Sequence, residues 1–176
     1  MNSIFPLLYS LALFFFLSLI SFFIIKQIIN TQKLEKKIFQ LQEVIKKDNP
    51  YYEDFYQLGQ LYLRKKLFLK AIVVFRKALK LWDPNDKIGL GNLYNAVGFT
   101  FFNLKEYNYA IYYYKVAIKI IPDYTLALIN LGYSFEKVNS IVIAYNCYKA
   151  ALFWDPYNTL ASTRFSVVEK KLSYIL

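Results

Sequence analysis

Residues 94–122 read YNAVGFTFFNLKEYNYAIYYYKVAIKIIP, and residues 128–156 read LINLGYSFEKVNSIVIAYNCYKAALFWDP. The two stretches agree in residue type at eight positions when they are superposed so that Gly98 falls on Gly132. The paired positions are Tyr94 and Leu128, Val97 and Leu131, Gly98 and Gly132, Phe101 and Phe135, Ala110 and Ala144, Tyr114 and Tyr148, Ala117 and Ala151, and Pro122 and Pro156. A fixed internal period of about 34 residues is typical of a stack of structural repeats.

An earlier copy of the pattern precedes these two at a longer spacing. Its members are Phe55, Leu58, Gly59, Tyr62, Ala71, Phe75 and Ala78, and its proline, Pro84, follows one residue late. The step from Gly59 to Gly98 exceeds the step from Gly98 to Gly132 by five positions, which indicates an insertion within 82–90. The sequence therefore predicts three repeats, over about 52–84, 91–124 and 125–158.

The repeated residues predict pairs of packed helices. In each copy a glycine on the first helix permits the close approach of an alanine on the second, where a larger side chain would clash; in the second copy these are Gly98 and Ala110. Aromatic residues fill the space between the helices, and a proline restricts the residue before it and ends the second helix. The expected structural positions are Gly59, Ala71, Ala78, Gly98, Ala110, Ala117, Pro122, Gly132, Ala144, Ala151 and Pro156.

The expected fold is all-α, with a repeat domain over 51–176. The hairpins should be formed by helices over 52–65 and 68–81, 91–104 and 107–120, and 125–138 and 141–154. A further helix over about 159–172 should cap the face that the last hairpin leaves open.

A charge-free segment precedes the repeats and predicts a transmembrane anchor over 1–25. Residues 4–25 would form a helix of roughly 33 Å at about 1.5 Å per residue, which spans a hydrocarbon core. A cleaved signal peptide is the alternative, but a basic start, a short apolar region and a small-residue cleavage site are not convincing here. Because lysines follow the segment and no basic side chain precedes it, we expect the C-terminal domain to stay in the cytoplasm or stroma.

The residues after the anchor predict a basic amphipathic helix over 26–50. Leu34, Ile38, Leu41 and Ile45 follow helical spacing, and Asp48-Asn49-Pro50 should end the helix. Two heptads favour packing against the first repeat over a self-associating coiled coil. Its lysines could contact anionic lipid, although topology and solubility account for them at least as well.

The charge of the chain is concentrated near the anchor, and its composition excludes much enzyme chemistry. The net charge is +8 from Lys26 to Lys80 and +2 from Leu81 to Leu176. The chain has no histidine and one cysteine, Cys147, so it cannot form an intramolecular disulfide, a Cys/His zinc site or a histidine base. It also has no phosphate loop, catalytic carboxylate pair or nucleophile elbow. We therefore expect no enzyme activity, cofactor, metal or small-molecule substrate.

Two further features have ordinary structural interpretations. Basic pairs such as Lys36-Lys37 are not accompanied by a nucleic-acid motif, so no nucleic-acid partner is expected. Cys147 falls in the second helix of the third repeat, where a small buried residue is the default.

The repeated pattern consists of a bulky residue, Leu-Gly, an aromatic, then Ala, an aromatic, Ala and Pro, and it resembles the tetratricopeptide repeat (TPR). The resemblance covers residues 52–156, and the family's usual tryptophan is replaced by Phe55, Tyr94 and Leu128. It implies that the first helices line a concave, protein-binding groove. The groove residues implied are Tyr56, Gln60, Leu63, Asn92, Asn95, Phe99, Phe102, Leu126, Ile129, Tyr133 and Glu136.

The resemblance also indicates which ligands the groove should not take. Co-chaperones of the family hold acidic tails with a clamp of cations and amides, and the clamp positions here are Tyr56, Gln60, Ala96, Leu126 and Asn130. The cations are missing, so a carboxylate clamp is not expected. Our hypothesis is that the groove holds an apolar or neutral segment of a partner protein. The alternative for any one groove aromatic is packing within the fold.

The order of segments is similar to the membrane-anchored TPR proteins of plastids and cyanobacteria that are associated with photosystem I assembly. The residue usage, typical of an AT-rich genome, fits a plastid copy. The resemblance implies a scaffold in the thylakoid membrane with its repeats in the stroma, where it contacts photosystem I subunits or assembly intermediates. The alternative is a membrane-bound targeting or import receptor that binds apolar segments of client proteins.

Overall fold

The computed structural model describes residues 4–46 and 50–174, and every regular element in these ranges is an α-helix. The chain forms two compact units, which divide between Val44 and Ile45, and each is described by itself. The expected end of the basic helix at Asp48 and Asn49 lies outside the described residues, as do the ends of the expected domains at 1–3 and 175–176.

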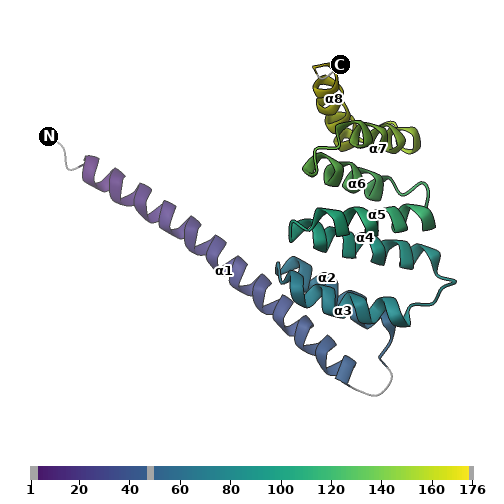
Figure 1. Cartoon of the computed structure of the whole chain (residues 1–176). Helices are drawn as coiled ribbons and strands as arrows, with labels where there is room; N and C mark the ends of the chain where they lie inside the picture. The colour runs from purple at the N-terminus through teal and green to yellow at the C-terminus, as the bar shows by residue number, and fades with distance from the viewer. Residues whose placement is uncertain (1–3, 47–49, 175–176) are drawn as a thin grey trace. The chain divides into compact units, whose positions relative to one another are not determined.

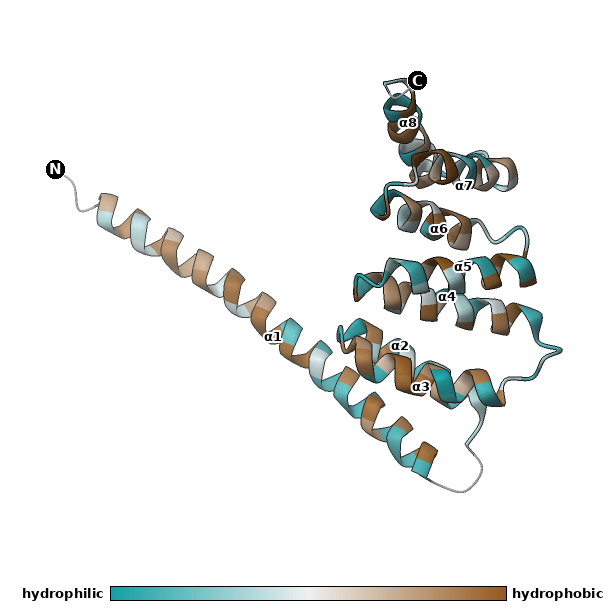
Figure 2. Ribbon diagram, viewed as in Figure 1, coloured by the Kyte–Doolittle hydropathy of each residue, from teal (hydrophilic) through white to brown (hydrophobic). Residues whose placement is uncertain are grey.

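Helix α1 (Ile4–Lys46) is one uninterrupted helix that covers both the expected anchor and most of the expected basic helix. Its large apolar side chains from Phe5 to Ile29 are exposed, and the ribbon colours in Figure 2 change along it from mostly hydrophobic residues to a mixture of hydrophobic and hydrophilic residues. The Ser10 hydroxyl donates to the Leu7 carbonyl at 2.9 Å, which satisfies this polar group within the helix. By length and composition α1 could cross a membrane.

The second unit is a stack of three antiparallel hairpins followed by a single helix (Figure 1). Successive hairpins pack on one another through α3 and α4, α5 and α6, and α7 and α8. The expected fold class is confirmed. The helices are α2 (Tyr52–Arg64), α3 (Phe68–Leu81), α4 (Lys87–Asn103), α5 (Tyr107–Ile120), α6 (Thr125–Lys137), α7 (Ile141–Trp154) and α8 (Thr159–Ser173).

The boundaries agree with the expected ones to within one residue except at α4, which begins four residues early. The inserted residues thus add a helical turn as well as a loop. The Asp86 carboxylate caps the new N-terminus, because it accepts from the Gly89 N–H at 2.8 Å. It also accepts from Trp82 Nε1 at 3.2 Å, and the Trp82 ring lies 4.5 Å from that of Tyr52.

The repeat glycines face aromatic rings. A Cβ atom on Gly98 would lie 2.8 Å from the Tyr114 ring, and one on Gly132 would lie 2.7 Å from the Tyr148 ring. The atoms nearest to such a Cβ belong to the aromatic residue four positions after the repeat alanine, so this ring fills the space beside each glycine. Positions four apart share a helix face, so the small alanine, Ala110 for example, lets the ring reach across.

We expect Gly98→Ala to destabilise the repeat unit by about 1–3 kcal/mol, because the buried Tyr114 ring must move. The loss should outweigh the gain of about 1 kcal/mol in helix propensity. Urea unfolding followed by circular dichroism measures it. In a Tyr114→Leu background the cost should shrink, and an equal cost in both backgrounds would contradict the contact.

The turn inside each hairpin uses the same left-handed residue. Lys66, Lys105 and Asn139 have φ of 57°, 66° and 59° and occupy equivalent repeat positions. In the second hairpin the Lys105 N–H donates to the Phe102 carbonyl, and the next N–H donates to the Phe101 carbonyl, both at 3.0 Å. These two bonds form a Schellman motif, whose left-handed position usually holds glycine.

Lys105→Gly should therefore stabilise the protein by about 0.5–1 kcal/mol, since glycine adopts this conformation without the Cβ penalty. Asn139→Gly should gain less, because asparagine tolerates the left-handed region. Thermal unfolding would register both changes. Lys149→Gly, inside a helix, serves as the control and should lose about 1 kcal/mol.

Helix α8 takes the place of the first helix of a fourth repeat. Asn158 caps it by accepting from the Ala161 N–H at 3.0 Å. When the repeat period is continued, Ser166 and Glu169 stand where Gly132 and Phe135 stand in α6, and both are exposed. The face that would receive another second helix is thus polar, as the outer face of a capping helix is.

Candidate protein-binding groove

The first helices of the repeats, α2, α4 and α6, lie next to one another and line the first section of a groove. This section encloses about 480 Å³. Amide, aromatic and aliphatic side chains dominate its lining, and Arg64 is its one cation among the lining residues. The lining residues are Tyr56, Gln60, Leu63, Arg64, Asn92, Asn95, Ala96, Phe99, Tyr124, Leu126 and Asn130.

A second section continues the groove towards α8 and encloses about 520 Å³. Phe99 and Asn130 line both sections, so the two form one surface across all the repeats. Phe99 is 43% exposed, which leaves much of its ring available to a ligand. The lining residues of the second section are Phe99, Phe102, Tyr114, Asn130, Tyr133, Glu136, Lys137, Arg164 and Lys171.

An amide chain crosses the floor of the first section. The Asn130 side-chain amide donates to Asn95 Oδ1 at 3.1 Å, and the Asn95 amide donates to the Tyr124 hydroxyl at 3.3 Å. Asn95 is buried, so this chain satisfies a polar group that would otherwise be costly. Burial raises the pKa of Tyr124, and the negative charge that an ionised Tyr56 would carry raises it further. The floor is therefore polar but neutral.

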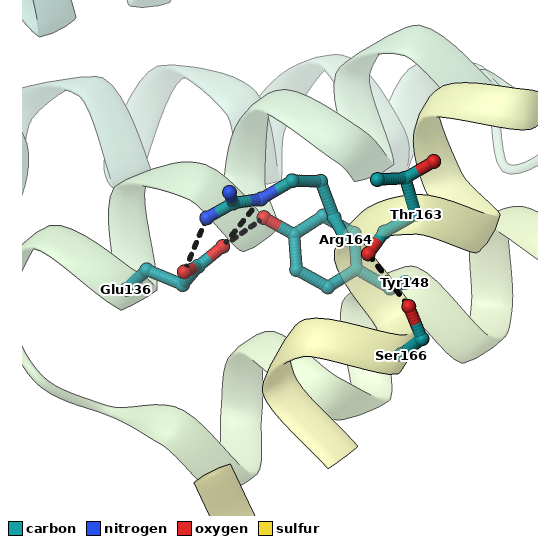
Figure 3. A network of polar contacts seen from close by, with 5 residues as sticks. All are labelled: Glu136, Tyr148, Thr163, Arg164 and Ser166. Atoms are coloured by element: carbon teal, nitrogen blue, oxygen red, sulfur yellow. Dashed lines mark hydrogen bonds and ion pairs between the residues drawn. The ribbon is translucent and has the colours of Figure 1, made fainter. Parts of the chain in front are cut away.

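A charged cluster forms one wall of the second section (Figure 3). Arg164 donates to both carboxylate oxygens of Glu136, from its Nε at 3.2 Å and from a terminal nitrogen at 2.5 Å. The Tyr148 hydroxyl donates to the same carboxylate at 2.6 Å. The guanidinium also lies over the Tyr133 ring, 4.8 Å from its centre.

The pKa shifts in this cluster follow from these contacts. The Glu136 carboxylate, as the acceptor of its hydrogen bonds, raises the pKa of Arg164, so the guanidinium stays charged. Burial raises the pKa of Tyr148, and the neighbouring carboxylate raises it further. The Glu136 side chain is 8% exposed, so the pair places a neutralised carboxylate in the wall.

The structure brings together ten of the eleven expected groove residues. Ile129 is the exception: it is 1% exposed and packs in the core, so its placement in the groove was wrong. Glu136 lines the groove, yet its carboxylate is occupied by Arg164 and Tyr148 and is not a free acidic contact. Whether the other nine bind a partner stays a prediction.

Sequence reasoning missed the cations at the α8 end of the groove. Arg164, Lys137 and Lys171 line the second section, and α8 supplies two of them. The repeat period indicates that these residues belong to the groove. Lys171 lies one period after Lys137, and Arg164 lies one period after Asn130. Residues 159–172 were predicted only as a capping helix, whereas α8 also continues the row of first helices that lines the groove.

Arg164→Met should cost about 2–3 kcal/mol of stability, because it leaves a largely buried carboxylate without its cation. The double variant Arg164→Met/Glu136→Gln should recover most of this loss, since the amide can still accept from Tyr148. Urea unfolding of the four proteins in the cycle measures the coupling. Additive losses would contradict the role of the pair.

Cys147 lies in the core on α7 and is 8% exposed. Burial raises the pKa of its thiol from 9.0 to about 11, and the charge of Lys115 opposes part of the rise. Such a thiol is inert as a nucleophile near neutral pH. Among residues 4–46 and 50–174, no group of three or more Cys, Asp or Glu side chains could hold a metal ion.

At pH 8 the thiol of Cys147 should react with iodoacetamide roughly 100-fold more slowly in the folded protein than in urea, since its pKa is higher by about two units. The raised pKa also means that the folded state favours the protonated thiol. This contribution to stability is complete below pH 9 and is lost as the pH rises towards 11. Comparing the pH dependence of the free energy of unfolding between Cys147→Ala and the unmodified protein would separate the contribution of the thiol from that of tyrosine ionisation.

Comparisons with known proteins agree with this architecture. A family model described as tetratricopeptide repeat matches residues 55–84. The first TPR domain of Spaghetti (RPAP3), solved bound to the HSP90 peptide SRMEEVD, superposes with a TM-score of 0.63 and 20% identity over 69% of this chain and 93% of that one. The hairpins, the glycine contacts and the groove along the first helices define a TPR solenoid, a class of protein-interaction scaffold.

Relatives that align over almost the whole chain identify its family within the TPR proteins. The protein ycf37 of Guillardia theta is 37% identical over 172 residues, which are 98% of this chain and 97% of that protein. The chain belongs to the ycf37 family of TPR proteins. The TPR domain-containing protein PYG7, chloroplastic, of Arabidopsis thaliana is 28% identical over 93% of this chain, which spans 54% of PYG7.

Proposed function

We propose that this protein is a thylakoid membrane scaffold that holds an apolar or neutral segment of immature photosystem I subunits in its TPR groove. The observation that carries the proposal is the groove itself, whose two adjoining sections extend from α2 to α8, on a chain that also carries the long apolar helix α1. The binding step requires no chemistry beyond recognition and release.

The lining of the groove supports this class of ligand. In the first section, the half-exposed Phe99 and Leu126 side chains surround the neutral amide floor. The TPR domain of Spaghetti, which has the same fold and is bound to the peptide SRMEEVD, supports the view that this fold can hold a peptide. That peptide is acidic, whereas the first section here has the single cation Arg64, so an apolar or amide-rich segment fits it better. Any carboxylate of the partner would be placed in the second section, near Lys137 and Lys171.

The membrane location rests on α1 and on the relatives. Its apolar part is long enough to span a bilayer, and the lysines that follow it favour a stromal repeat unit. The plastid assignment draws on the chloroplastic relative PYG7, and the photosystem I assignment on the resemblance of the segment order. An anchor would confine scaffold and client to one surface, so that weak contacts suffice.

Phe99→Ala/Leu126→Ala should weaken client binding roughly 30-fold or more, which is about 2 kcal/mol, because it removes two central apolar contacts of the groove. Both side chains are about half exposed, so the fold should survive. Tyr133 is left unchanged, since its ring supports Arg164. Quantitative co-purification from thylakoid membranes, with helical content measured by circular dichroism, tests this expectation.

The matched control is Tyr157→Ala/Tyr174→Ala, which removes two exposed aromatic residues outside the groove. It should leave co-purification unchanged. Equal binding by the groove variant and the unmodified protein would remove the groove from the mechanism.

Mass spectrometry of the co-purified proteins tests the client assignment. Photosystem I subunits and their assembly intermediates are expected. A broad set of presequences would instead identify a targeting or import receptor and overturn the assembly role.

A further inference from the structure

The second helices of the hairpins, α3, α5 and α7, share an unusual charge composition. Together they contain seven Lys or Arg residues and no Asp or Glu. The acidic residues of the repeat unit lie elsewhere, in α2, α6, α8 and the turns, and Glu106 directly precedes α5. The second helices are thus free of negative side chains along their length, and the acids Asp83, Asp123 and Asp155 follow their C-terminal ends.

Five repeat positions on these helices are exposed in all three hairpins, and we call them the outer face. Three of these positions lie towards the N-terminal end of each helix. Lys70, Asn108 and Asn146 take three of their nine sites, and the other six sites form an apolar band of Leu69, Val73, Tyr109, Tyr112, Val142 and Ile143. All six side chains are between 45% and 72% exposed. An apolar surface repeated over three helices is unusual for a face in contact only with water.

A basic band follows towards the C-terminal end of each helix. Arg76, Lys115 and Lys149 occupy one repeat position on α3, α5 and α7, so they form a ladder of cations across the hairpins. Lys80 and Lys119 occupy the next exposed position, which holds the exposed Phe153 in α7. A regular ladder of like charges repels itself, which favours an anionic surface as its partner.

Helix dipoles do not account for this pattern. A dipole favours cations in the last turn, which explains Lys80 and Lys119, but the ladder of Arg76, Lys115 and Lys149 lies before the last turn. It also favours acidic residues in the first turn, and none of the three helices has one there. The absence of acids is therefore a property of the surface and not of the helix ends.

We propose that the outer face docks on the surface of a lipid bilayer that contains anionic headgroups. The ladder would contact the headgroups, and the adjacent band of tyrosines and aliphatic side chains would enter the interfacial region. The inference rests on the anchoring part of the proposed function. At about 1.5 Å per residue, the part of α1 after Ile25 is roughly 30 Å long, so an anchored repeat unit stays close to the bilayer.

A bilayer fits this face better than nucleic acid does. RNA would need aromatic platforms for its bases beside the cations. Here Leu69, Val73, Val142 and Ile143 make up most of the apolar band, and aliphatic side chains cannot stack on bases. They can insert among lipid headgroups, as tyrosine rings do at membrane interfaces.

The test uses the full chain reconstituted in vesicles of phosphatidylcholine alone, or with roughly a third of phosphatidylglycerol. A polarity-sensitive fluorophore is attached to Val142→Cys in the apolar band, or to Ser162→Cys on α8 as the control position. Because Cys147 is buried and its pKa is raised to about 11, labelling at pH 7 selects the introduced thiol. A shift towards an apolar environment is expected only at Val142→Cys and only with phosphatidylglycerol.

The variant Arg76→Gln/Lys115→Gln/Lys149→Gln should abolish this shift. Each cation contributes about fivefold, so the ratio of docked to free repeat units should fall roughly 100-fold. The variant Lys137→Gln/Lys170→Gln/Lys171→Gln removes the same charge outside the outer face and should retain the shift. Equal loss in both variants would reduce the effect to net charge and overturn the assignment to the ladder.

Flotation of the vesicles separates this inference from the anchor. Flotation with both lipid compositions but no shift at Val142→Cys would overturn outer-face docking and leave the anchor intact. Failure to float with phosphatidylcholine would overturn the anchor, while a shift retained with phosphatidylglycerol would still support the outer face. A shift caused by polyuridylate, and not by phosphatidylglycerol, would identify a nucleic-acid surface and overturn the lipid proposal.

Discussion

The contact between a glycine and an aromatic ring is the constraint on which the rest of the structure depends. In each hairpin a buried ring, that of Phe75, Tyr114 or Tyr148, lies where a Cβ atom on the opposite glycine would be. The ring fixes the distance between the two helices, and repetition of the contact stacks the hairpins. The groove along the first helices and the outer face on the second helices are both consequences of this stacking.

Most of the fold could be predicted because the period of about 34 residues by itself indicates where each helix of a repeat begins and ends. Gly98 and Gly132 define the repeat, and the turn residues and prolines set the helix ends to within a residue. The start of α4 could not be predicted, since Asp86 acts as a cap only because the inserted residues bring it next to Trp82 and Gly89. The aromatic ring beside each glycine was not predicted, because spacing along the chain does not tell which of two residues on one helix face reaches across.

The groove was less predictable than the fold. Its residues on α2, α4 and α6 follow from the register of the repeat, but Ile129 shows that one step around a helix separates the groove from the core. The environment of the Glu136 carboxylate depends on Arg164, which is 28 residues away in sequence and belongs to α8, the helix outside the three hairpins. A pairing such as this one, between side chains of two different helices, can be found only from the three-dimensional structure.

The ion pair between Arg164 and Glu136 affects how the repeat stack unfolds. Linear arrays tend to lose their terminal units first, because an end repeat has only one neighbour. Here two charge-assisted hydrogen bonds and a contact with the Tyr133 ring join α8 to α6. They oppose the separation of α8 from the rest of the stack. The terminal helix of the described repeat unit is thereby held in place, so the wall that this ion pair forms in the second section of the groove is rigid.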